Sequence, residues 1–544
     1  MRSTFICITV IATLSGGCGS TSASSGTGTS WSSGANGSSD DVTYGDSAAS
    51  SDSQYGGTDS AAADVYTKPD LPPEKEKDYD FGAPEGSPNF VYIPAAGTDN
   101  LVKISGASLQ VTLVEVGDRP ILAKTVPGHD AVLVINAGSD DVAYVRSSAT
   151  GDTIDFLPIS PHANTLIVSP DGTSAVAFYD HAHPIPGEPA GSLQDVTLFR
   201  LGDKPEVAHL AVGFHPTSVA YRKDGTQAFV VTDDGVCVIH PATAQDGDIV
   251  PPIALSKDPL DKPAEREVQI TSDGAWAIVR QSGLNGLNAV HLASKKLATL
   301  ALNAAPTDLD LLPDGSAALA VVRDTGEVAI VTLPADPTEV LEATVLSTGS
   351  LIAGLAQITE DGKTALLYTT AAGIEQAATL DFATKTIAPV LLRKTVDLAL
   401  LVPGTRKAIL VHSPAPGPNY NDATEKFVDD SEGITLYDLD TGYTKLVLTP
   451  VRATGIATMA TPALAWLLLP DPANLDHGVL RANLKQFQTE IIALGSPPEY
   501  ARVLESAQVV AVTQTHPSGR VTFLPVGAGA AKTVTGYELN GKAH

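Results

Sequence analysis

The feature that most constrains the fold is a short turn motif that recurs along the chain between two apolar runs. Its clearest copy spans residues 165–180, where Pro170, Asp171 and Gly172 separate the runs. Proline presets φ at the first corner, aspartate bonds back to the backbone, and glycine adopts a positive φ that other residues avoid. The flanking Val, Ile, Leu, Ala and Phe suit a pleated, buried surface. Each copy therefore predicts a β-hairpin.

The motif repeats at intervals that match the blades of a propeller. Further copies end at Gly225, Gly274, Gly315 and Gly362, and Pro403-Gly404 is a reduced version. Spacings of about 40 to 55 residues are typical of four-stranded blades. From residue 89 we count ten units; the opening unit lacks a clear first strand, and the others read strand, turn, strand, variable loop, strand, turn, strand. No linker rich in Pro, Gly or Ser interrupts them, so one closed ring is expected rather than two bodies.

Composition agrees with one large all-β body. Of the 544 residues, 43% are hydrophobic and 5% aromatic, so cores built from Ala, Val, Leu and Ile are expected.

A formal net charge of -28 opposes binding to nucleic acid, because phosphate contacts need Lys and Arg. No apolar run reaches the ~20 residues that span a bilayer. Because Cys7 and Cys18 lie in the leader, Cys237 has no disulfide partner and is expected in a buried strand.

Residues 1–17 have the pattern of an export signal. Arg2 supplies the positive charge, residues 5–14 an apolar segment, and residues 15–17 small side chains before Cys18. The stretch 14–18 resembles the lipobox of bacterial lipoproteins, whose cysteine is diacylated and becomes the mature N-terminus. Leu14 lies four residues before Cys18 where that family prefers three, and cleavage by an ordinary signal peptidase is the alternative. The resemblance implies a palmitate-bearing lipoprotein of the outer membrane or cell surface, with the periplasmic face as an alternative.

Residues 18–88 are expected to form a disordered tether. The segment is rich in Ser, Gly, Thr, Ala and Asp at its start, and charged and proline-rich from Lys68 to Lys77. Such a composition buries too little apolar surface to offset the entropy of ordering. The tether is expected to hold the folded body, residues 89–544, away from the lipid.

The repeating units resemble the YVTN-type β-propeller repeat of lactonase-like proteins. The resemblance covers residues 89–540 and is strongest over residues 166–180, 215–232 and 306–322. It implies an all-β fold, a single large β-propeller of four-stranded antiparallel blades, with seven to ten blades. That family commonly has seven blades and a literal Tyr-Val-Thr-Asn, which no unit retains here. Residues 533–540 are expected to complete the opening blade, which lacks a clear first strand, and so to leave no exposed edge.

Three long loops form the candidate binding site. They are expected between the second and third strands of their units, at residues 180–191, 412–430 and 470–478, and all should project from one rim. The candidate rim residues are His181, His183, Glu188, His412, Asn419, Tyr420, Asp422, Asp429, Asp430, Asp471, Asp476 and His477. These side chains suit a protein or glycan ligand of the cell envelope, and the chain itself is expected to be a monomer.

Metal binding has weaker support. His181 and His183, with Asp180 beside them, could ligate a divalent cation, but their spacing matches no known metal signature. The alternative is that they are exposed loop histidines. The acidic residues between 422 and 432 admit either calcium or a solvated loop. No other cofactor is expected.

Three interpretations of function follow, and the sequence leaves open whether the chain is an enzyme. The first is a lipid-anchored cell-envelope propeller that is a non-catalytic binding or scaffold module. The second is a metal-dependent, lactonase-like hydrolase of the periplasm or cell surface, with His181 and His183 around the metal. The third is a subunit of a larger envelope assembly. The chain contains no Gly-x-Ser-x-Gly, His-Glu-x-x-His, Walker or Cys-x-x-Cys motif, which favours the first.

Overall fold

The computed structural model describes residues 80–148, 151–257, 263–337, 340–471 and 477–536. These residues all belong to one compact unit, and they form ten antiparallel sheets in which strands pair in chain order. Each sheet is one blade, and the ten blades are numbered here in chain order. Within the described residues, blade 4 has three strands and the other nine blades have four. The predicted all-β propeller is confirmed, with ten blades.

The strands of the first five blades are as follows. Blade 1 comprises β1 (Glu85–Gly86), β2 (Phe90–Ala95), β3 (Asn100–Ser105) and β4 (Val111–Glu115); blade 2 comprises β5 (Pro120–Thr125), β6 (Ala131–Asn136), β7 (Asp141–Ser148) and β8 (Gly151–Pro158); blade 3 comprises β9 (Thr165–Val168), β10 (Ser174–Phe178), β11 (Asp195–Arg200) and β12 (Glu206–Ala211); blade 4 comprises β13 (Ser218–Tyr221), β14 (Ala228–Thr232) and β15 (Gly235–Ile239); blade 5 comprises β16 (Arg266–Ile270), β17 (Trp276–Gln281), β18 (Gly286–His291) and β19 (Lys296–Ala301).

The second five blades follow the same order. Blade 6 comprises β20 (Asp308–Leu311), β21 (Ala317–Val322), β22 (Glu327–Thr332) and β23 (Glu342–Ser347); blade 7 comprises β24 (Leu355–Ile358), β25 (Thr364–Tyr368), β26 (Gln376–Asp381) and β27 (Thr386–Leu391); blade 8 comprises β28 (Leu398–Leu401), β29 (Lys407–His412), β30 (Glu432–Asp438) and β31 (Thr444–Thr449); blade 9 comprises β32 (Gly455–Met459), β33 (Leu464–Leu469), β34 (Gly478–Asn483) and β35 (Gln488–Ala493); blade 10 comprises β36 (Pro498–Leu504), β37 (Val509–Gln514), β38 (Arg520–Pro525) and β39 (Lys532–Thr535). The described helices are the 3-10 turns η1 (Pro263–Glu265) and η2 (Arg323–Thr325) and the α-helix α1 (Ala423–Asp429).

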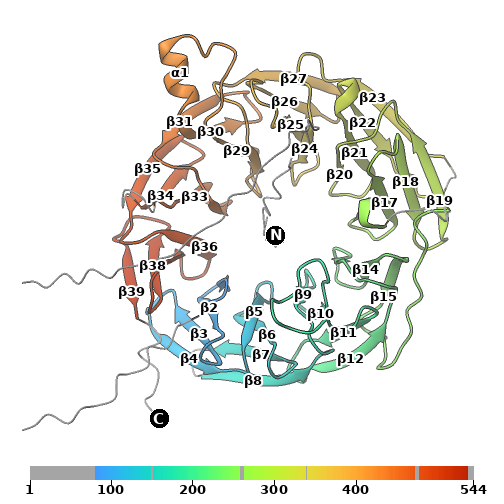
Figure 1. Ribbon diagram of the computed structural model, residues 1–544, viewed down its shortest axis with the longest axis vertical. Coiled ribbons are helices and arrows are strands. Elements are labelled where there is room, and N and C mark those ends of the chain that lie inside the picture. The colour runs from blue at the N-terminus through green and yellow to red at the C-terminus, as the bar shows by residue number, and fades with distance from the viewer. Residues whose placement is uncertain (1–79, 149–150, 258–262, 338–339, 472–476, 537–544) are drawn as a thin grey trace, which may run out of the picture. The chain divides into compact units, whose positions relative to one another are not determined.

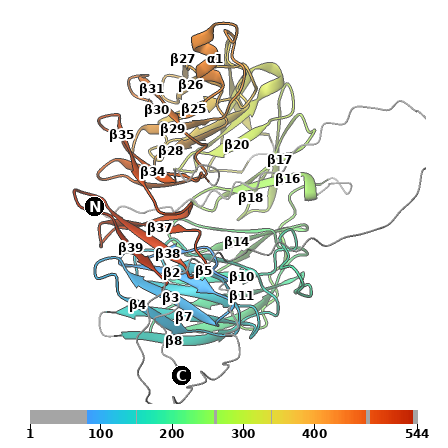
Figure 2. The ribbon, with the colours of Figure 1, turned by 60° about the vertical axis from the view of Figure 1, so that its left-hand side comes forward.

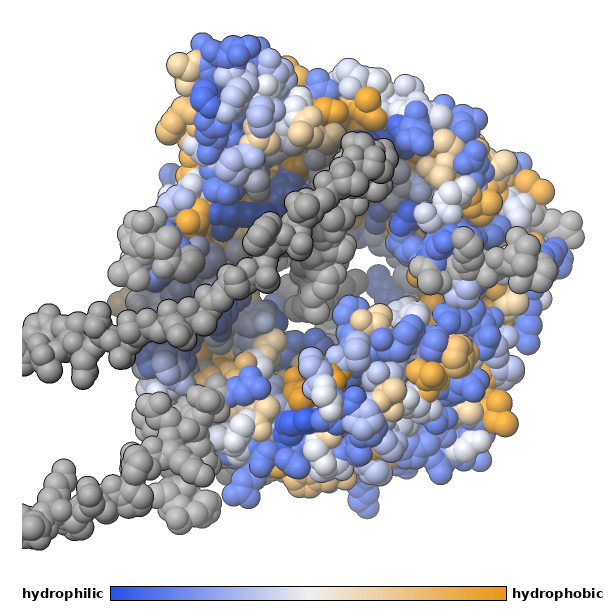
Figure 3. Space-filling model, in the orientation of Figure 1, coloured by the Kyte–Doolittle hydropathy of each residue, from blue (hydrophilic) through white to orange (hydrophobic). Residues whose placement is uncertain are grey.

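The blades surround a central opening. Figure 1 shows β5, β9, β24 and β36 nearest the axis and β8, β12, β27 and β39 on the outside. Figure 3 shows that the opening persists when all atoms are drawn. The helix α1 lies at the edge of the ring beside β27 (Figure 1 and Figure 2). None of the described helices is long and apolar enough to cross a membrane.

The hydrophobic core is divided into ten layers, one between each pair of neighbouring blades. The strand β6 shows how the apolar side chains of one strand contribute to two layers of the core. Its Ala131, Leu133 and Ile135 pack toward blade 3, whereas Val132 and Val134 pack toward blade 1. Because successive side chains of a strand point to opposite faces, a strand between two blades needs an apolar residue at every position. This explains why the middle strands read as unbroken apolar runs.

The hairpins predicted from the turn motif are confirmed. In the copy that joins β9 to β10, Asp171 Oδ1 accepts the Thr173 N–H at 3.1 Å, and Gly172 has a φ of 71°. An aspartate also accepts the N–H two residues on at Asp224, Asp273, Asp314 and Asp361. Cys237 lies in β15 and is fully buried, as expected.

The ring closes by packing between blades 10 and 1 and by a backbone hydrogen bond from the Ser506 N–H to the Pro88 carbonyl at 2.9 Å, and the expected exchange of strands between the chain ends is wrong. The strand β39 pairs with β38 as the outer strand of its own blade, while the two-residue β1 pairs with β2. Val91 and Ile93 of blade 1 then pack against Phe523 of blade 10. Because β1 lies at residues 85–86, the boundary expected at residue 89 falls inside blade 1. The signal peptide, Cys18 and the tether up to residue 79 lie outside the described residues.

Among the described residues, blade 4 has no outer strand, and the reason is chemical. Val236 of β15 exchanges two backbone hydrogen bonds with Ile253, at 2.8 and 3.0 Å. The next hydrogen-bonded position of such an antiparallel ladder would need an N–H from residue 251, which is a proline and has none. The segment instead crosses to blade 3, where residues 248 and 250 bond the backbone of Ala211. This segment, residues 240–253, is called the blade link below.

Candidate functional site: the long-loop rim

We define the long-loop rim as the end of the ring that carries the loops between second and third strands and the connections between blades. Strand direction alternates in each meander, so these connections all lie at one end. The long loops are residues 179–194 of blade 3, 413–431 of blade 8 and 470–477 of blade 9. Blades 8 and 9 are neighbours, whereas blade 3 is halfway around the ring from blade 8 (Figure 1). The topology thus places all three loops at one rim but on two sides of the opening.

The loop of blade 3 points its two histidines at different partners. His183 Nδ1 lies 2.7 Å from Asp180 Oδ2. The His181 ring instead stacks on His215, with 4.1 Å between the ring centroids. Across the described ranges, no group of three or more His, Cys, Asp or Glu side chains is placed to hold a metal ion.

An exposed stack of rings is the main feature of this side of the rim. The centroids of the Phe214 and His215 rings lie 3.8 Å apart, and Phe214 is 40% exposed. Elsewhere in the same loop, Glu188 pairs with Arg119 at 2.6 Å and lies 3.8 Å from His162. The arrangement combines aromatic faces with polar groups at their edge, which suits recognition of a partner that is itself part apolar and part polar.

On the other side of the opening, α1 is held at both of its ends. Asp422 caps the N-terminus by accepting the backbone N–H groups two and three residues on. At the C-terminus, Lys394 Nζ donates to the carbonyls of Val428 and Asp429, at 2.7 and 2.9 Å. A lysine at this end also complements the helix dipole. The short helix is therefore presented in one orientation despite its seven residues.

The outer face of α1 is exposed and chemically mixed. Lys426 Nζ lies 4.0 Å from the centroid of the Tyr420 ring and 2.7 Å from Asp430 Oδ2. Tyr420 also donates to Asp430 Oδ1 at 2.8 Å. The neighbouring Phe427 is 66% exposed. An aromatic, a cation and an unpartnered apolar ring thus face solvent together.

Beneath α1 lies a buried cluster of charged groups. Lys394 and Asp429 are each only 1% exposed, and Asp429 Oδ2 accepts the Gly417 N–H at 2.8 Å. Burial lowers the pKa of Lys394, against the opposing effect of the carboxylates around it. Burial, and then Asp429, raise the pKa of Glu375. Burial also raises the pKa of Glu432, whose Oε2 is buried without a partner in the described structure. The cluster joins the loop to the blades beneath it.

Four of the rim residues expected from the sequence are buried. They are His412, Asp429, Asp471 and His477. His412 ends β29, and its ring lies 2.8 Å from the Thr395 carbonyl and 2.7 Å from the Thr435 hydroxyl. Burial lowers the pKa of His412 to about 4, because the charged imidazolium is disfavoured there. These residues support the loops and do not reach solvent.

The remaining expected residues lie at the surface or outside the described ranges. His181, His183, Asn419, Asp422 and Asp430 are exposed, and Glu188 and Tyr420 are half-buried. Asp471 and His477 meet each other, since the Asp471 N–H donates to His477 Nδ1 at 3.2 Å. Asp476 lies outside the described residues.

Sequence reasoning missed an acidic cluster on the inner strands. Burial, then Asp308 and Glu267, raise the pKa of Asp310 to about 8, and its Oδ2 is buried without a partner in the described structure. At the equivalent position of the two neighbouring blades, Gln269 and Gln357 donate to the backbone of the next blade. Asp310 thus occupies a position where a donor is needed. The available signal was the alternation Asp-Leu-Asp-Leu in β20, a polar pattern in an apolar slot.

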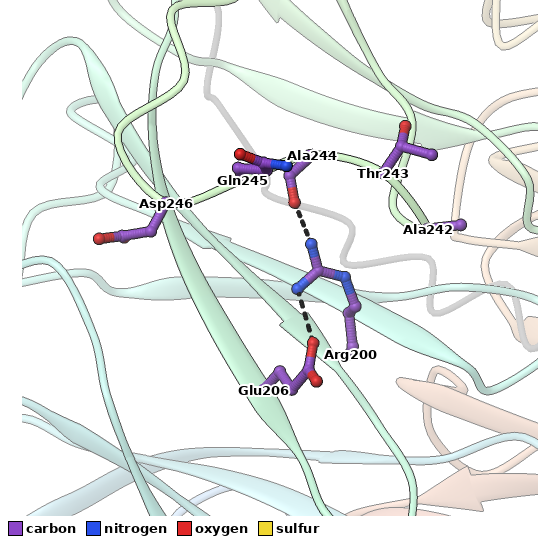
Figure 4. Close-up of a pocket in the computed structure, with 7 residues that line it drawn as sticks. All are labelled: Arg200, Glu206, Ala242, Thr243, Ala244, Gln245 and Asp246. Carbon is purple, nitrogen blue, oxygen red and sulfur yellow. Dashed lines mark hydrogen bonds and ion pairs between the residues drawn. The ribbon is translucent and has the colours of Figure 1, made fainter.

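Two cavities touch the blade link. The first, of about 510 Å³, is lined by Arg200, Glu206 and residues 242–246 (Figure 4). The Arg200 guanidinium there bonds Glu206 at 3.1 Å and the Pro241 carbonyl at 2.7 Å, and also reaches the Ala244 carbonyl. Its donors therefore hold the link in place. The second cavity, of about 340 Å³, is lined by residues 159–161, Asp195, residues 209–211 and Gly247.

Comparison with known proteins finds only distant structural similarity. No protein-family model matches it, and no curated protein is similar to it. Kuenenia stuttgartiensis hydrazine synthase is 17% identical, covers 61% of this chain and 99% of its own, and has a TM-score of 0.29. A eukaryotic initiation factor is 11% identical, with 76% and 96% covered and a TM-score of 0.47. The dihydro-heme d1 dehydrogenase NirN is 12% identical, with 72% and 78% covered and a TM-score of 0.41. The ten antiparallel sheets of the structure define its class as that of β-propellers, and no activity is transferred at such similarity.

Proposed function

We propose that this chain is a cell-envelope lipoprotein whose ten-bladed propeller is a binding or scaffold module that contacts its partner through the long-loop rim. The observation that carries the proposal is the shared placement of the three long loops at one rim. Exposed loops on a rigid scaffold are where proteins place binding residues. The propeller supplies that scaffold.

The rim chemistry supports a macromolecular partner. One side carries the ring stack of Phe214, His215 and His181, and the other carries Tyr420 and Phe427 with Lys426 beside them. Aromatic side chains are enriched at protein interfaces and in their energetic hot spots. The two groups lie on opposite sides of the ring (Figure 1), so only a protein or a polymeric glycan can contact both.

The entry point of the chain supports the anchoring half of the proposal. The carbonyl of Asp80 accepts the Ala96 N–H at 3.0 Å, and Ala96 begins a loop of the long-loop rim. The described chain therefore begins at this rim. In the proposal, acyl chains on Cys18 hold the protein at the envelope membrane.

The anchor is tested by replacing the acylated residue. We expect Cys18→Ala to move the protein from the detergent-soluble membrane fraction to the aqueous fraction, because the acyl chains are lost. Mass spectrometry of the mature wild-type N-terminus should show a diacylglyceryl cysteine at residue 18. Cys237→Ala is the matched control and should stay in the membrane fraction. A mature protein whose N-terminus carries no lipid would refute the anchor and leave the rim proposal standing.

The rim is tested by variants at both ends of the ring. We expect Phe427→Ser to reduce recovery of a bound envelope partner by about tenfold or more in affinity capture, the typical loss for a buried aromatic anchor. Tyr443→Ser is the control, since Tyr443 is 55% exposed but lies between β30 and β31 at the opposite rim. Equal recovery by both variants, or an equal loss in both, would count against the rim.

A further inference from the structure

The second cavity, of about 340 Å³, lies at the long-loop rim of blade 3, and none of the candidate rim residues lines it. Its volume is at the low end of the ~300–1,000 Å³ range of small-molecule sites, so its ligand must be small. Asp195 and Thr197 of β11 share one face of the strand with Phe199, whose ring packs in the layer between blades 2 and 3. The cavity therefore lies on the side of blade 3 that is turned to blade 2. It does not depend on the proposed anchor or partner.

A chain of three polar side chains is fixed at this cavity. Thr197 Oγ1 accepts the Ser160 N–H at 2.9 Å, and it lies 3.1 Å from Ser160 Oγ and 3.3 Å from His209 Nδ1. Thr197 and His209 stand directly opposite each other in the pairing of β11 with β12. Thr197 is fully buried and Ser160 is 8% exposed. The chain is thus held by backbone register as well as by its own bonds.

This chain of hydrogen bonds can run in either direction. Thr197 has one hydroxyl proton, and it can donate either to His209 Nδ1 or to Ser160 Oγ. In the first case His209 offers a Nε2–H donor and Ser160 offers lone pairs. In the second case Ser160 offers its proton and His209 Nε2 becomes an acceptor. Within the described residues no hydrogen bond to His209 Nε2 is found. The site can therefore pair with a group that both donates and accepts, which is the property of a hydroxyl.

The other residues that line the cavity determine which ligand charge it can accept. Asp195 contributes an acceptor, and its Oδ2 already holds the Ser192 hydroxyl at 2.6 Å. No lysine or arginine is among the residues that line the cavity, so an anionic ligand would find no counter-charge. Pro161 and Ala211 add apolar surface beside the polar groups. A neutral ligand with hydroxyl groups and C–H faces meets all of these conditions.

We propose that this cavity binds a neutral polyhydroxylated molecule of monosaccharide size. Ser160 and His209 exchange hydrogen bonds with its hydroxyl groups, and Asp195 accepts a hydrogen bond from one of them. Thr197 is a positioning residue, because it sets the direction of the chain without reaching the ligand.

The test is calorimetric titration of the purified full-length protein with glucose, galactose, mannose and N-acetylglucosamine. We expect saturable binding of at least one sugar with a dissociation constant in the millimolar range, as is usual for a ligand of about a dozen heavy atoms. Thr197→Val keeps the shape but removes the hydroxyl, and Asp195→Asn removes the charge. Each should weaken binding by about tenfold. Thr522→Val is the matched control, since Thr522 is a buried, hydrogen-bonded threonine of blade 10, and it should bind as the wild type does.

Thermal unfolding separates loss of binding from loss of fold. If Thr197→Val unfolds, the half-buried Asp195→Asn variant still tests the site. No saturable binding by any of the four sugars would overturn the proposal, as would wild-type affinity in both variants. Tighter binding of glucose 6-phosphate than of glucose would show an anion site and overturn it. Binding of ethanolamine in place of the sugars would show an amine site and also overturn it.

Discussion

Replacing Asp310 with asparagine is expected to stabilise the propeller, and by more as the pH rises from 4 to 8. In the native protein, burial raises the pKa of Asp310 from 3.8 to about 8. Each pKa unit corresponds to about 1.4 kcal/mol, so the ionised group costs on the order of 5 kcal/mol at pH 8 and above. Asparagine has the same shape, carries no charge and supplies the N–H donor that Gln269 and Gln357 supply in the neighbouring blades.

The sign of the pH dependence follows from proton binding. Between pH 4 and 8 the folded protein keeps a proton on Asp310 that the unfolded chain has lost. The contribution of this group is therefore complete below pH 4 and disappears as the pH rises to about 8. The Asp310→Asn variant has no group that titrates at this position, so it does not lose this stability as the pH rises. Its melting temperature should match that of the wild type near pH 4 and exceed it at pH 8, as measured by differential scanning calorimetry.

A second aspartate of the same blade provides the control. Asp314 lies in the turn between β20 and β21, where the N–H and hydroxyl of Ser316 bond its Oδ1 at 3.0 and 2.7 Å. These bonds lower the pKa of Asp314. Asp314→Asn should therefore slightly destabilise the protein above pH 4, which is the opposite sign. An Asp310→Asn variant that is no more stable than the wild type at pH 8 would refute the assignment.

Replacing Lys394 with methionine is expected to cost about 3–5 kcal/mol of folding free energy, because it leaves the buried Asp429 and the half-buried Glu375 and Glu432 without their cation. Lys394 is 1% exposed, and it bonds the two carbonyls at the end of α1. Glu375 and Glu432 lose the favourable charge that partly offsets their burial. The loss should appear as a lower melting temperature and as faster hydrogen exchange confined to residues 413–431.

Lys426 is the matched control for this experiment. Lys426 belongs to the loop of residues 413–431, and its Nζ lies 2.7 Å from Asp430 Oδ2. Unlike Lys394, its side chain is 48% exposed. Exposed ion pairs contribute little, so Lys426→Met should leave the melting temperature unchanged. If Lys394→Met behaves like Lys426→Met, the buried cluster does not hold the loop.

The hairpins of this fold could be derived from the sequence because turn chemistry is local. Asp171 and Gly172 specify a turn through their own backbone conformation and a bond two residues away, and the same pattern marks Asp224, Asp273, Asp314 and Asp361. Ring closure could not be derived in the same way. A two-residue strand such as β1 leaves almost no periodic signal, and its role depends on packing between Val91 and Phe523, which are far apart in the chain.

For the candidate site, too, the sequence predicted the local features and missed those that depend on contacts between distant residues. The sequence identified the long loops correctly as excursions, since their Pro, Gly and Asp content breaks the strand pattern. It did not separate His412, which is buried between Thr395 and Thr435, from Tyr420, whose ring borders solvent. Both are polar residues of one loop region, and only their neighbours from other strands decide which of them a partner can reach.

By itself the sequence determined the β-hairpins, the number of repeating units and the apolar character of the middle strands. These follow from local φ preferences and from the two-residue period of a strand. Only the tertiary structure decided how the ring closes, that Asp310 Oδ2 is buried without a partner among the described residues, and that Ser160, Thr197 and His209 meet at one cavity. Each of these depends on the register between strands from different parts of the chain, and register is set by packing across the whole blade.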